Sequence, residues 1–251
     1  MTSDGLAAIR VGTGNRVLML HGVGLRAEAW SAQFEALSRE YALFAPDLPG
    51  HGETAMPING ANLADFADQI AAAIDAPCFV VGHSLGAMIA LDLAVRYADK
   101  IRAVVALNAV FRRDAAAKSA VQDRAVALGT ESAPNPAPTL RRWFGPNISP
   151  ERTACREWLT SVRQPGYRAA YSIFANNDGP SDAALSDLAC PALFLTGEAD
   201  PNSTPAMSHA MAGLAPNGRA QIVEGAAHML PMTHADQVNT ALLSFFRDVS
   251  R

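Results

Sequence analysis

Six short runs of apolar, strand-forming residues recur along the chain, and each ends at a turn-forming residue. Their hydrophobic residues are continuous rather than alternating, which is typical of strands buried on both faces of a sheet. Segments with apolar residues at helical spacing, such as 63–74, separate several of them. This alternation predicts an α/β fold with a mostly parallel sheet and helices on both faces. The six runs are 17–22, 41–47, 78–84, 103–108, 192–197 and 220–225.

A further strand candidate opens the chain. The segment "GLAAIRVGTGNRVLMLHG" places Gly12, Thr13, Gly14 and Asn15 between two strand-like runs. Glycine and asparagine accept the backbone conformations that tight turns between antiparallel strands require. We therefore expect the chain to begin with a β-hairpin.

The alternation of strands and helices stops between about residues 111 and 182. The stretch "PNPAPTL" interrupts this region, and helix-like pieces such as "ERTACREWLTSVR" follow it. We expect one domain over residues 1–251, with a helical insertion at about 111–182. The insertion carries ten basic and seven acidic residues, a formal charge of +3 in a chain whose net charge is −4. The remainder of the chain, at −7, is therefore acidic.

The charge and the cysteine content argue against several classes of protein. Binding to nucleic acid needs a basic surface, which a net charge of −4 does not suggest. The three widely spaced cysteines, Cys78, Cys155 and Cys190, indicate neither a disulfide framework nor a zinc site. The first residues lack the features of a signal peptide, and no apolar run is long enough to span a bilayer. We expect a soluble, cytoplasmic protein with neither a nucleic-acid nor a membrane partner.

The segment Gly82-His83-Ser84-Leu85-Gly86 joins a strand-like run directly to a helix-like one. In a Gly-x-Ser-x-Gly turn the serine lies on strained backbone, and small residues two positions away avoid a clash. The following helix points its free N–H groups and the positive end of its dipole at the hydroxyl. The pattern predicts a nucleophile at Ser84. A plain strand-to-helix turn would fit it too, so a base, an acid and oxyanion donors are also required.

His228 is the predicted base. It lies in "VEGAAHMLPM", directly after the last strand-like run, where a loop at the carboxyl edge of the sheet could hold its imidazole over the serine. His83 adjoins Ser84, but its side chain leaves the turn in another direction, and we expect it to have a packing role.

The acid is sought in "LTGEADPNSTP", just beyond the strand-like run 192–197, because sheets of this kind use the order serine, acid, histidine. Asp200 is preferred, since a turn before Pro201 can direct it inward, and Glu198 is the alternative. The preceding strand, the other place for such an acid, ends at Asn108. Its lack of a carboxylate there strengthens the prediction of Asp200.

Two backbone amides should stabilise an oxyanion. The amide of Leu85, directly after the nucleophile, is the first. The loop "HGVG" (21–24) brings small residues to the same edge of the sheet and points to Val23 as the second, with Gly24 as the alternative.

Together these motifs resemble the α/β-hydrolase fold superfamily, in its small capped form similar to carboxylesterases and 3-oxoadipate enol-lactonase. The resemblance implies a three-layer α/β/α sandwich with an eight-stranded, mostly parallel sheet and a helical cap. It also implies a triad of Ser84, Asp200 and His228 with oxyanion positions Val23 and Leu85, and no metal or organic cofactor. Asp47 and His51 match a structural turn of the family. The matching segments, in family order, are 20–24, 46–52, 82–86, 196–205 and 225–231.

The function implied is hydrolysis of a small-molecule carboxylic ester or lactone through an acyl-enzyme. Cofactor-free carbon–carbon bond hydrolysis and non-catalytic ligand binding are the alternatives, since relatives of the same fold use the same triad for both. Nothing in the sequence fixes an oligomeric state.

Two groups of side chains in the insertion bear on the substrate. Its aromatic residues are candidates for an apolar pocket wall, although most could simply pack the insertion onto the sheet. They are Phe111, Trp143, Phe144, Trp158, Tyr167, Tyr171 and Phe174. The arginine pairs at 112–113 and 141–142 could bind a substrate carboxylate, although exposed arginines are more often solvated.

Overall fold

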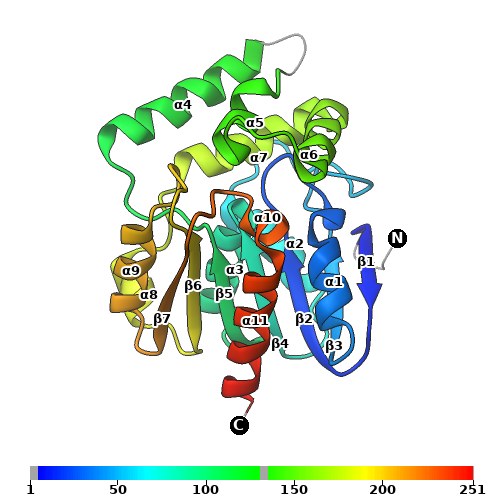
Figure 1. Cartoon of the computed structure of the whole chain (residues 1–251), viewed down its shortest axis with the longest axis vertical. Coiled ribbons are helices and arrows are strands. Elements are labelled where there is room, and N and C mark those ends of the chain that lie inside the picture. Colours follow the sequence, from blue (N-terminus) through cyan, green and yellow to red (C-terminus); the bar gives the residue numbers. More distant parts are fainter. Residues whose placement is uncertain (1–4, 131–134, 251) are drawn as a thin grey trace.

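The computed structural model describes residues 5–130 and 135–250. Within them, a seven-stranded sheet forms the centre of the molecule in the order β1-β3-β2-β4-β5-β6-β7 (Figure 1). All neighbouring strands are parallel except β1 and β3. The expected α/β architecture with a mostly parallel sheet is therefore confirmed. The strands are β1 (Ala8–Val11), β2 (Asn15–Leu20), β3 (Tyr41–Pro46), β4 (Cys78–His83), β5 (Ile101–Leu107), β6 (Ala192–Gly197) and β7 (Gly218–Val223).

The opening β-hairpin is a wrong prediction. β1 pairs with β3, with Ala8 opposite Pro46, and β3 lies between β1 and β2. The connection from β1 to β2 crosses the start of β3 so closely that a Cβ on Gly12 would lie 2.2 Å from the carbonyl oxygen of Tyr41. Gly12 and Gly14 also adopt positive φ angles of 82° and 112°. The two glycines therefore serve a crossing over a neighbouring strand rather than a turn between paired strands.

The expected count of eight strands also differs from the structure, which has seven in its described part. The eighth strand was implied by the family resemblance alone. The sequence itself offers six buried runs and one opening strand, and these are the seven that form. Seven strands suffice to bring β2, β4, β5 and β6 together at the centre of the sheet.

Alternate residues of the strands face two separate hydrophobic clusters. Val80 and Val104 pack with α2 (Leu63–Ala72), α3 (Leu85–Arg96) and α9 (Pro205–Leu214) on one face. Val81 and Val105 pack with α1 (Ser31–Leu37) and α11 (Ala235–Val249) on the other. The three-layer sandwich follows, because the central strands β4, β5 and β6 are buried on both sides. Three short helices complete these layers: η1 (Ala27–Trp30), α8 (Asp182–Ser186) and α10 (Leu230–Thr233).

Four helices between β5 and β6 lie together at one end of the sheet, and we call them the cap helices (Figure 1). They are α4 (Ala115–Thr130), α5 (Ala137–Phe144), α6 (Pro150–Ser161) and α7 (Gln164–Asn176). The two ends of this segment meet, because the Arg113 side chain donates to Asp178 Oδ1 at 2.7 Å and the Arg112 amide donates to the Asp178 carbonyl at 3.0 Å. Gly166, at the start of α7, lies so close to the loop at Gly50 that a Cβ on it would be 2.2 Å from the Gly50 carbonyl oxygen.

Two features are absent from the described residues. No helix among them combines the length and the apolar character needed to cross a membrane. No group of three or more histidine, cysteine, aspartate or glutamate side chains in the same part of the chain is placed to hold a metal ion.

Candidate active site

Ser84 lies on strained backbone between β4 and α3. Its φ of 56° and ψ of −117° are unusual for a residue with a side chain. A Cβ on Gly82 would lie 2.1 Å from the Gly86 carbonyl oxygen, and one on Gly86 would lie 2.1 Å from that of Leu20. The two glycines of the Gly-x-Ser-x-Gly pattern are therefore required by close backbone approach. The turn projects Ser84 into a cavity beneath the cap helices.

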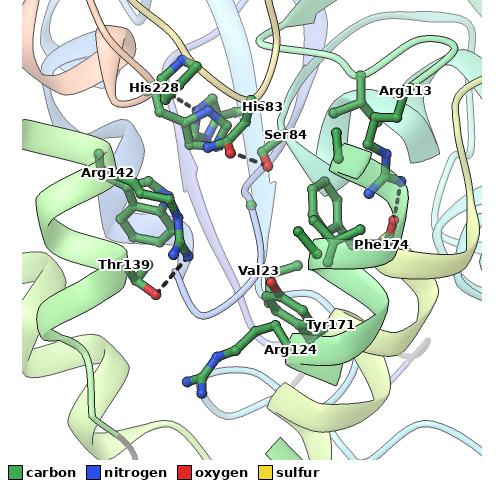
Figure 2. A pocket seen from close by; sticks show the side chains of 18 of the residues that line it. Val23, His83, Ser84, Arg113, Arg124, Thr139, Arg142, Tyr171, Phe174 and His228 are labelled. Atoms are coloured by element: carbon green, nitrogen blue, oxygen red, sulfur yellow. Dashed lines mark hydrogen bonds between the residues drawn. The ribbon is translucent and has the colours of Figure 1, made fainter. Parts of the chain in front are cut away.

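The structure brings the three predicted triad residues together. Ser84 Oγ lies 3.2 Å from His228 Nε2, and His228 Nδ1 lies 2.7 Å from Asp200 Oδ2. With the proton on Nδ1, the imidazole donates to the carboxylate and accepts from the serine hydroxyl. All three residues are buried, and Figure 2 shows the bond from Ser84 to His228. This arrangement can remove the serine proton as the hydroxyl attacks.

Asp200 is held as a carboxylate by its surroundings. Burial alone would raise its pKa, but the charge and hydrogen bond of His228, with hydrogen bonds from the Asn202 amide and the Asn108 side chain, lower the pKa below its ordinary value. The alternative acid, Glu198, is exposed and accepts a hydrogen bond from the Gly225 amide at 3.1 Å. The structure thus places Asp200, and not Glu198, against the histidine.

Asn108 has a role that the sequence analysis missed. Its Nδ2 donates to Asp200 Oδ2 at 2.6 Å, and it lies fully buried at the end of β5 with a φ of 49°. From the sequence, Asn108 served only to show that no carboxylate follows this strand. Asn108 follows β5, and Asp200 follows the neighbouring strand β6, so both lie at the same edge of the sheet. This placement is the signal that would have identified Asn108 as a residue that positions Asp200.

His83 contacts the loop that carries His228. Its Nε2 donates to the His228 carbonyl oxygen at 2.8 Å, and the two rings lie 5.1 Å apart between centroids. Burial lowers the pKa of His83 to about 3, so its ring is neutral. From the other side, the cap residue Trp143 stacks on His228 with ring centroids 5.9 Å apart. The imidazole of His228 is therefore fixed from two sides.

The two predicted oxyanion amides are available. Neither the Val23 nor the Leu85 N–H has an acceptor within the part of the chain that the structure describes. The alternative donor, Gly24, is engaged, because its N–H donates to His51 Nε2 at 2.9 Å. Gly22 lies so close to Ser84 that a Cβ on it would be 3.1 Å from Ser84 Cβ. The "HGVG" loop thus lies directly beside Ser84.

Two buried residues of the 46–52 turn hold this loop. Besides the bond from Gly24 to His51, Asp47 Oδ1 accepts from the Ala27 amide at 2.8 Å. Burial lowers the pKa of His51 to about 3, which keeps Nε2 unprotonated and able to accept. His51 thus ties the turn to the loop that carries the Val23 amide, and Asp47 ties it to the start of η1 just beyond that loop.

Replacing His51 by leucine is therefore expected to lower kcat about tenfold or more with little change in KM, because the Val23 amide loses its fixed position. Steady-state kinetics on an ester substrate measures the split between kcat and KM. His51→Gln, which retains an acceptor for Gly24, is the matched control and should recover much of the loss. Circular dichroism measures the fraction of the variant that is folded. If the loss of activity merely equals the loss of folded protein, this role of His51 is contradicted.

The cavity in front of Ser84 has a volume of about 320 Å³ and is lined by core loops and cap helices. Of the seven predicted aromatic residues, four line it: Trp143, Tyr167, Tyr171 and Phe174. Phe111, Phe144 and Trp158 are instead packed against the hydrophobic core.

The predicted arginines divide in the same way. Arg112 is exposed and pairs with Asp182, whereas Arg113 reaches the cavity wall but is paired with Asp178. Arg142 lines the cavity, and its neighbour Arg141 does not. Arg124, which the sequence analysis did not single out, lines the cavity as well. Its segment carries no pattern that would have indicated this.

Comparison with known proteins agrees with the fold. The sequence profile of the alpha/beta hydrolase family matches residues 17–241. A malate-bound thermophilic esterase from Thermogutta terrifontis superposes with a TM-score of 0.86 at 28% identity, over 97% of this chain and 93% of that one.

Two curated relatives match nearly their whole length. The (E)-2-((N-methylformamido)methylene)succinate hydrolase of Acinetobacter baylyi is 38% identical over 239 residues, which is 92% of this chain and 90% of that protein. The pimeloyl-[acyl-carrier protein] methyl ester esterase of Xanthomonas oryzae is 32% identical over 251 residues, which is 95% of this chain and 98% of that protein. The chain therefore belongs to the alpha/beta hydrolase family and is an enzyme of that family.

Proposed function

We propose that the protein is a serine hydrolase that cleaves a small-molecule carboxylic ester or lactone through an acyl-enzyme on Ser84. The observation that carries this proposal is the hydrogen-bonded chain from Ser84 Oγ to His228 Nε2 (3.2 Å) and from His228 Nδ1 to Asp200 Oδ2 (2.7 Å), which opens onto a cavity of about 320 Å³. A cavity of this size fits a small substrate.

In the proposed reaction, His228 Nε2 takes the proton of Ser84 as its oxygen attacks the carbonyl carbon. Asp200 stabilises the imidazolium that forms, and the amides of Val23 and Leu85 donate to the oxyanion. His228 then gives the proton to the leaving alcohol. Water attacks the acyl-enzyme with His228 again as the base, and the acid product leaves with Ser84 restored.

A second candidate is hydrolysis of an amide by the same residues. The name of the Acinetobacter baylyi relative describes a substrate with an N-methylformamide group on a methylenesuccinate skeleton. The name of the Xanthomonas oryzae relative describes a methyl ester. Both linkages present a carbonyl carbon to a nucleophile, so the leaving group, an amine or an alcohol, distinguishes the two candidates.

The proposal predicts that diethyl p-nitrophenyl phosphate will release one equivalent of p-nitrophenolate per chain and leave a diethylphosphoryl group on Ser84, because Ser84 has an adjacent base and oxyanion donors. Absorbance measures the release, and mass spectrometry of the proteolysed protein locates the group. Ser84→Ala is the control and should remain unlabelled.

A substrate panel then separates the functions. It comprises p-nitrophenyl acetate, butyrate and octanoate, an enol-lactone, an N-formyl enamine and a vinylogous diketone. Ester or lactone turnover with labelling at Ser84 supports the proposal, and turnover of the N-formyl compound alone supports the second candidate. Cleavage of the diketone alone would make the protein a carbon–carbon hydrolase. A folded protein that neither labels nor turns over any compound would contradict a hydrolytic role for Ser84 and point to ligand binding.

A further inference from the structure

We infer that Thr196 and Ser203 are positioning residues for the predicted acid, Asp200. They act through Asn108, and they keep the carboxylate in place for its bond to His228. The inference rests on the proposed function, in which Asp200 stabilises the imidazolium of His228. Asn108 directly follows β5, Thr196 lies in the neighbouring strand β6 (Figure 1), and the other two residues lie in the loop after β6. All four side chains around the carboxylate are buried.

Three hydrogen bonds join Asn108, Thr196 and Ser203 into a closed ring. Thr196 Oγ1 donates to the Ser203 carbonyl oxygen at 2.7 Å, and Ser203 Oγ donates to the Asn108 carbonyl oxygen at 2.7 Å. Asn108 Nδ2 completes the ring by donating to Thr196 Oγ1 at 3.3 Å. Because the single proton of the Thr196 hydroxyl is used on Ser203, this hydroxyl accepts from Asn108. The direction of each bond in the ring is therefore fixed.

The ring determines which atom of the Asn108 amide faces the acid. One N–H of Nδ2 is directed at Thr196 Oγ1, and the other donates to Asp200 Oδ2 at 2.6 Å. A side chain turned over by 180° would place Oδ1 against the carboxylate, and two buried acceptors in contact repel each other. The Thr196 hydroxyl would then lose its bond from the amide as well. Thr196 thus selects the orientation in which Asn108 donates to Asp200.

Two features of Asn108 reduce stability and point to a functional role. Its φ of 49° lies in the left-handed region. Its Oδ1 is buried and has no hydrogen-bond partner in the part of the chain that the structure describes. Strained backbone and unpaired buried polar atoms are both costly, and they are concentrated at functional sites. Their occurrence in a residue that donates to Asp200 favours a role in placing the acid over a role in packing alone.

The ring also fixes the loop that carries Asp200. Ser203 lies in this loop, and its carbonyl oxygen and hydroxyl tie the loop to β6 and to the end of β5. Asp200 Oδ1 accepts from the Asn202 amide at 2.8 Å within the same loop. Asp200 Oδ2 accepts from Asn108 Nδ2 at 2.6 Å and lies 2.7 Å from His228 Nδ1. The carboxylate oxygen that meets the proposed base is therefore the one that the ring holds.

Backbone pairing at the same strand ends connects this ring to Ser84. The Ser84 amide donates to the Leu107 carbonyl oxygen at 2.9 Å, and the Asn108 amide donates to the Leu195 carbonyl oxygen at 2.9 Å. Ser84, Asn108 and Thr196 are thus held at the ends of three adjacent strands, β4, β5 and β6. The sheet sets the separation of the serine from the acid loop, and the ring places one carboxylate oxygen within that loop.

Two substitutions of Thr196 separate its hydroxyl from its packing. Valine has the shape of threonine without the hydroxyl, whereas serine keeps the hydroxyl and loses the methyl group. Thr196→Val is expected to lower kcat on p-nitrophenyl butyrate about tenfold with KM nearly unchanged, because a small displacement of a catalytic group has a large effect on rate. Thr196→Ser is the matched control and should retain most of the activity. A Thr196→Ser variant as slow as Thr196→Val, or a fully active Thr196→Val, would overturn the inference.

Ser203→Ala removes a different bond of the same ring and is expected to cause a loss of kcat similar to that of Thr196→Val. The double variant should be little slower than either single one, since both changes break one hydrogen-bond network. Losses that multiply in the double variant would show that the two residues act independently and would contradict the ring.

Proton NMR measures the placement of Asp200 without any turnover. The Nδ1 proton of His228 should give a low-field resonance protected from exchange with water, and Asp200→Asn should remove it and so assign it. We expect this resonance in the wild type, in Ser84→Ala and in Thr196→Ser, and a shift to higher field with faster exchange in Thr196→Val. An unchanged resonance in Thr196→Val, or none in the wild type, would overturn the inference even if Ser84 hydrolyses esters. The expected pattern in a protein without turnover would retain the inference and contradict the proposed function.

Discussion

Replacing Ser84 by alanine is expected to lower kcat for ester hydrolysis by about 10⁴-fold or more, with the fold unchanged. The expected loss is this large because, in the proposed reaction, Ser84 Oγ is the atom that forms the covalent bond to the substrate. Little loss of stability is expected, since the change removes the hydrogen bond of the hydroxyl to His228 and leaves the strand pairing of β4 in place. Relief of the strained backbone at Ser84 is not expected, because alanine has a Cβ in the same place.

His228→Ala is expected to cause a loss of similar size, and the double variant should be little worse than either single one. The reason is that the proton acceptor and the nucleophile act as one unit, so removal of either stops the same step. Single-turnover and steady-state kinetics on p-nitrophenyl butyrate measure these losses, and circular dichroism checks the fold. Retention of a tenth of the activity by Ser84→Ala would exclude this residue as the nucleophile.

Lowering the pH from 7 to 5 is expected to remove about 6 kcal/mol of folding free energy through three buried histidines. Burial lowers the pKa of His21 to about 4 and the pKa values of His51 and His83 to about 3. The ordinary value of 6.5 applies to the unfolded chain. Between pH 6.5 and about 4 the unfolded state therefore binds more protons than the native state, and stability present above pH 6.5 is lost as the pH falls.

Besides burial, the hydrogen bonds of two of these histidines oppose protonation. His21 Nε2 accepts from the Leu48 amide at 2.9 Å, and His51 Nε2 accepts from the Gly24 amide at 2.9 Å. A proton on either nitrogen would place two N–H groups against each other in a fully buried site. Protonation of either nitrogen in the native state would therefore break a hydrogen bond that holds the loops beside Ser84.

Urea unfolding at several pH values between 5 and 6.5 measures this effect. The free energy of unfolding should fall by about 3 to 4 kcal/mol per pH unit near pH 5.5, which corresponds to nearly three protons. His51→Gln removes one titrating group and should lower this slope by about one third, whatever its stability at neutral pH. A slope of one proton or less in the wild type would contradict the prediction.

The fold and the hydrogen-bonded group of Ser84, His228 and Asp200 were predictable because the sequence carries them in local patterns. Each buried strand is a continuous apolar run, and Ser84, Asp200 and His228 each follow such a run in the chain. The pairing of β1 was not predictable in this way, since the turn chemistry of Gly12 and Gly14 fits a hairpin and a crossing equally well. Only the close contact of Gly12 with Tyr41 in the folded sheet distinguishes the two.

The composition of the cavity was predicted only in part. The cap helices contribute aromatic and arginine residues to the cavity, the core and the surface alike, so residue type does not tell which location a given side chain takes. Arg141 and Arg142 are adjacent and chemically identical, yet only Arg142 lines the cavity. Asn108 shows the same limit, because its bond to Asp200 joins residues 92 positions apart and depends on the order of β5 and β6.

The meeting of Arg112 and Arg113 with Asp178 means that the cap segment leaves the sheet domain and returns to it at one place. A segment with such closely spaced ends can be lengthened, shortened or exchanged without altering the register of β5 and β6. Ser84, Asp200 and His228 lie outside this cap segment, whereas the aromatic residues that line the cavity lie within it. The proposed catalytic residues and much of the cavity wall are thus encoded by separate stretches of the gene. New substrate preferences could then arise by recombination at two neighbouring points while the reaction chemistry is inherited intact.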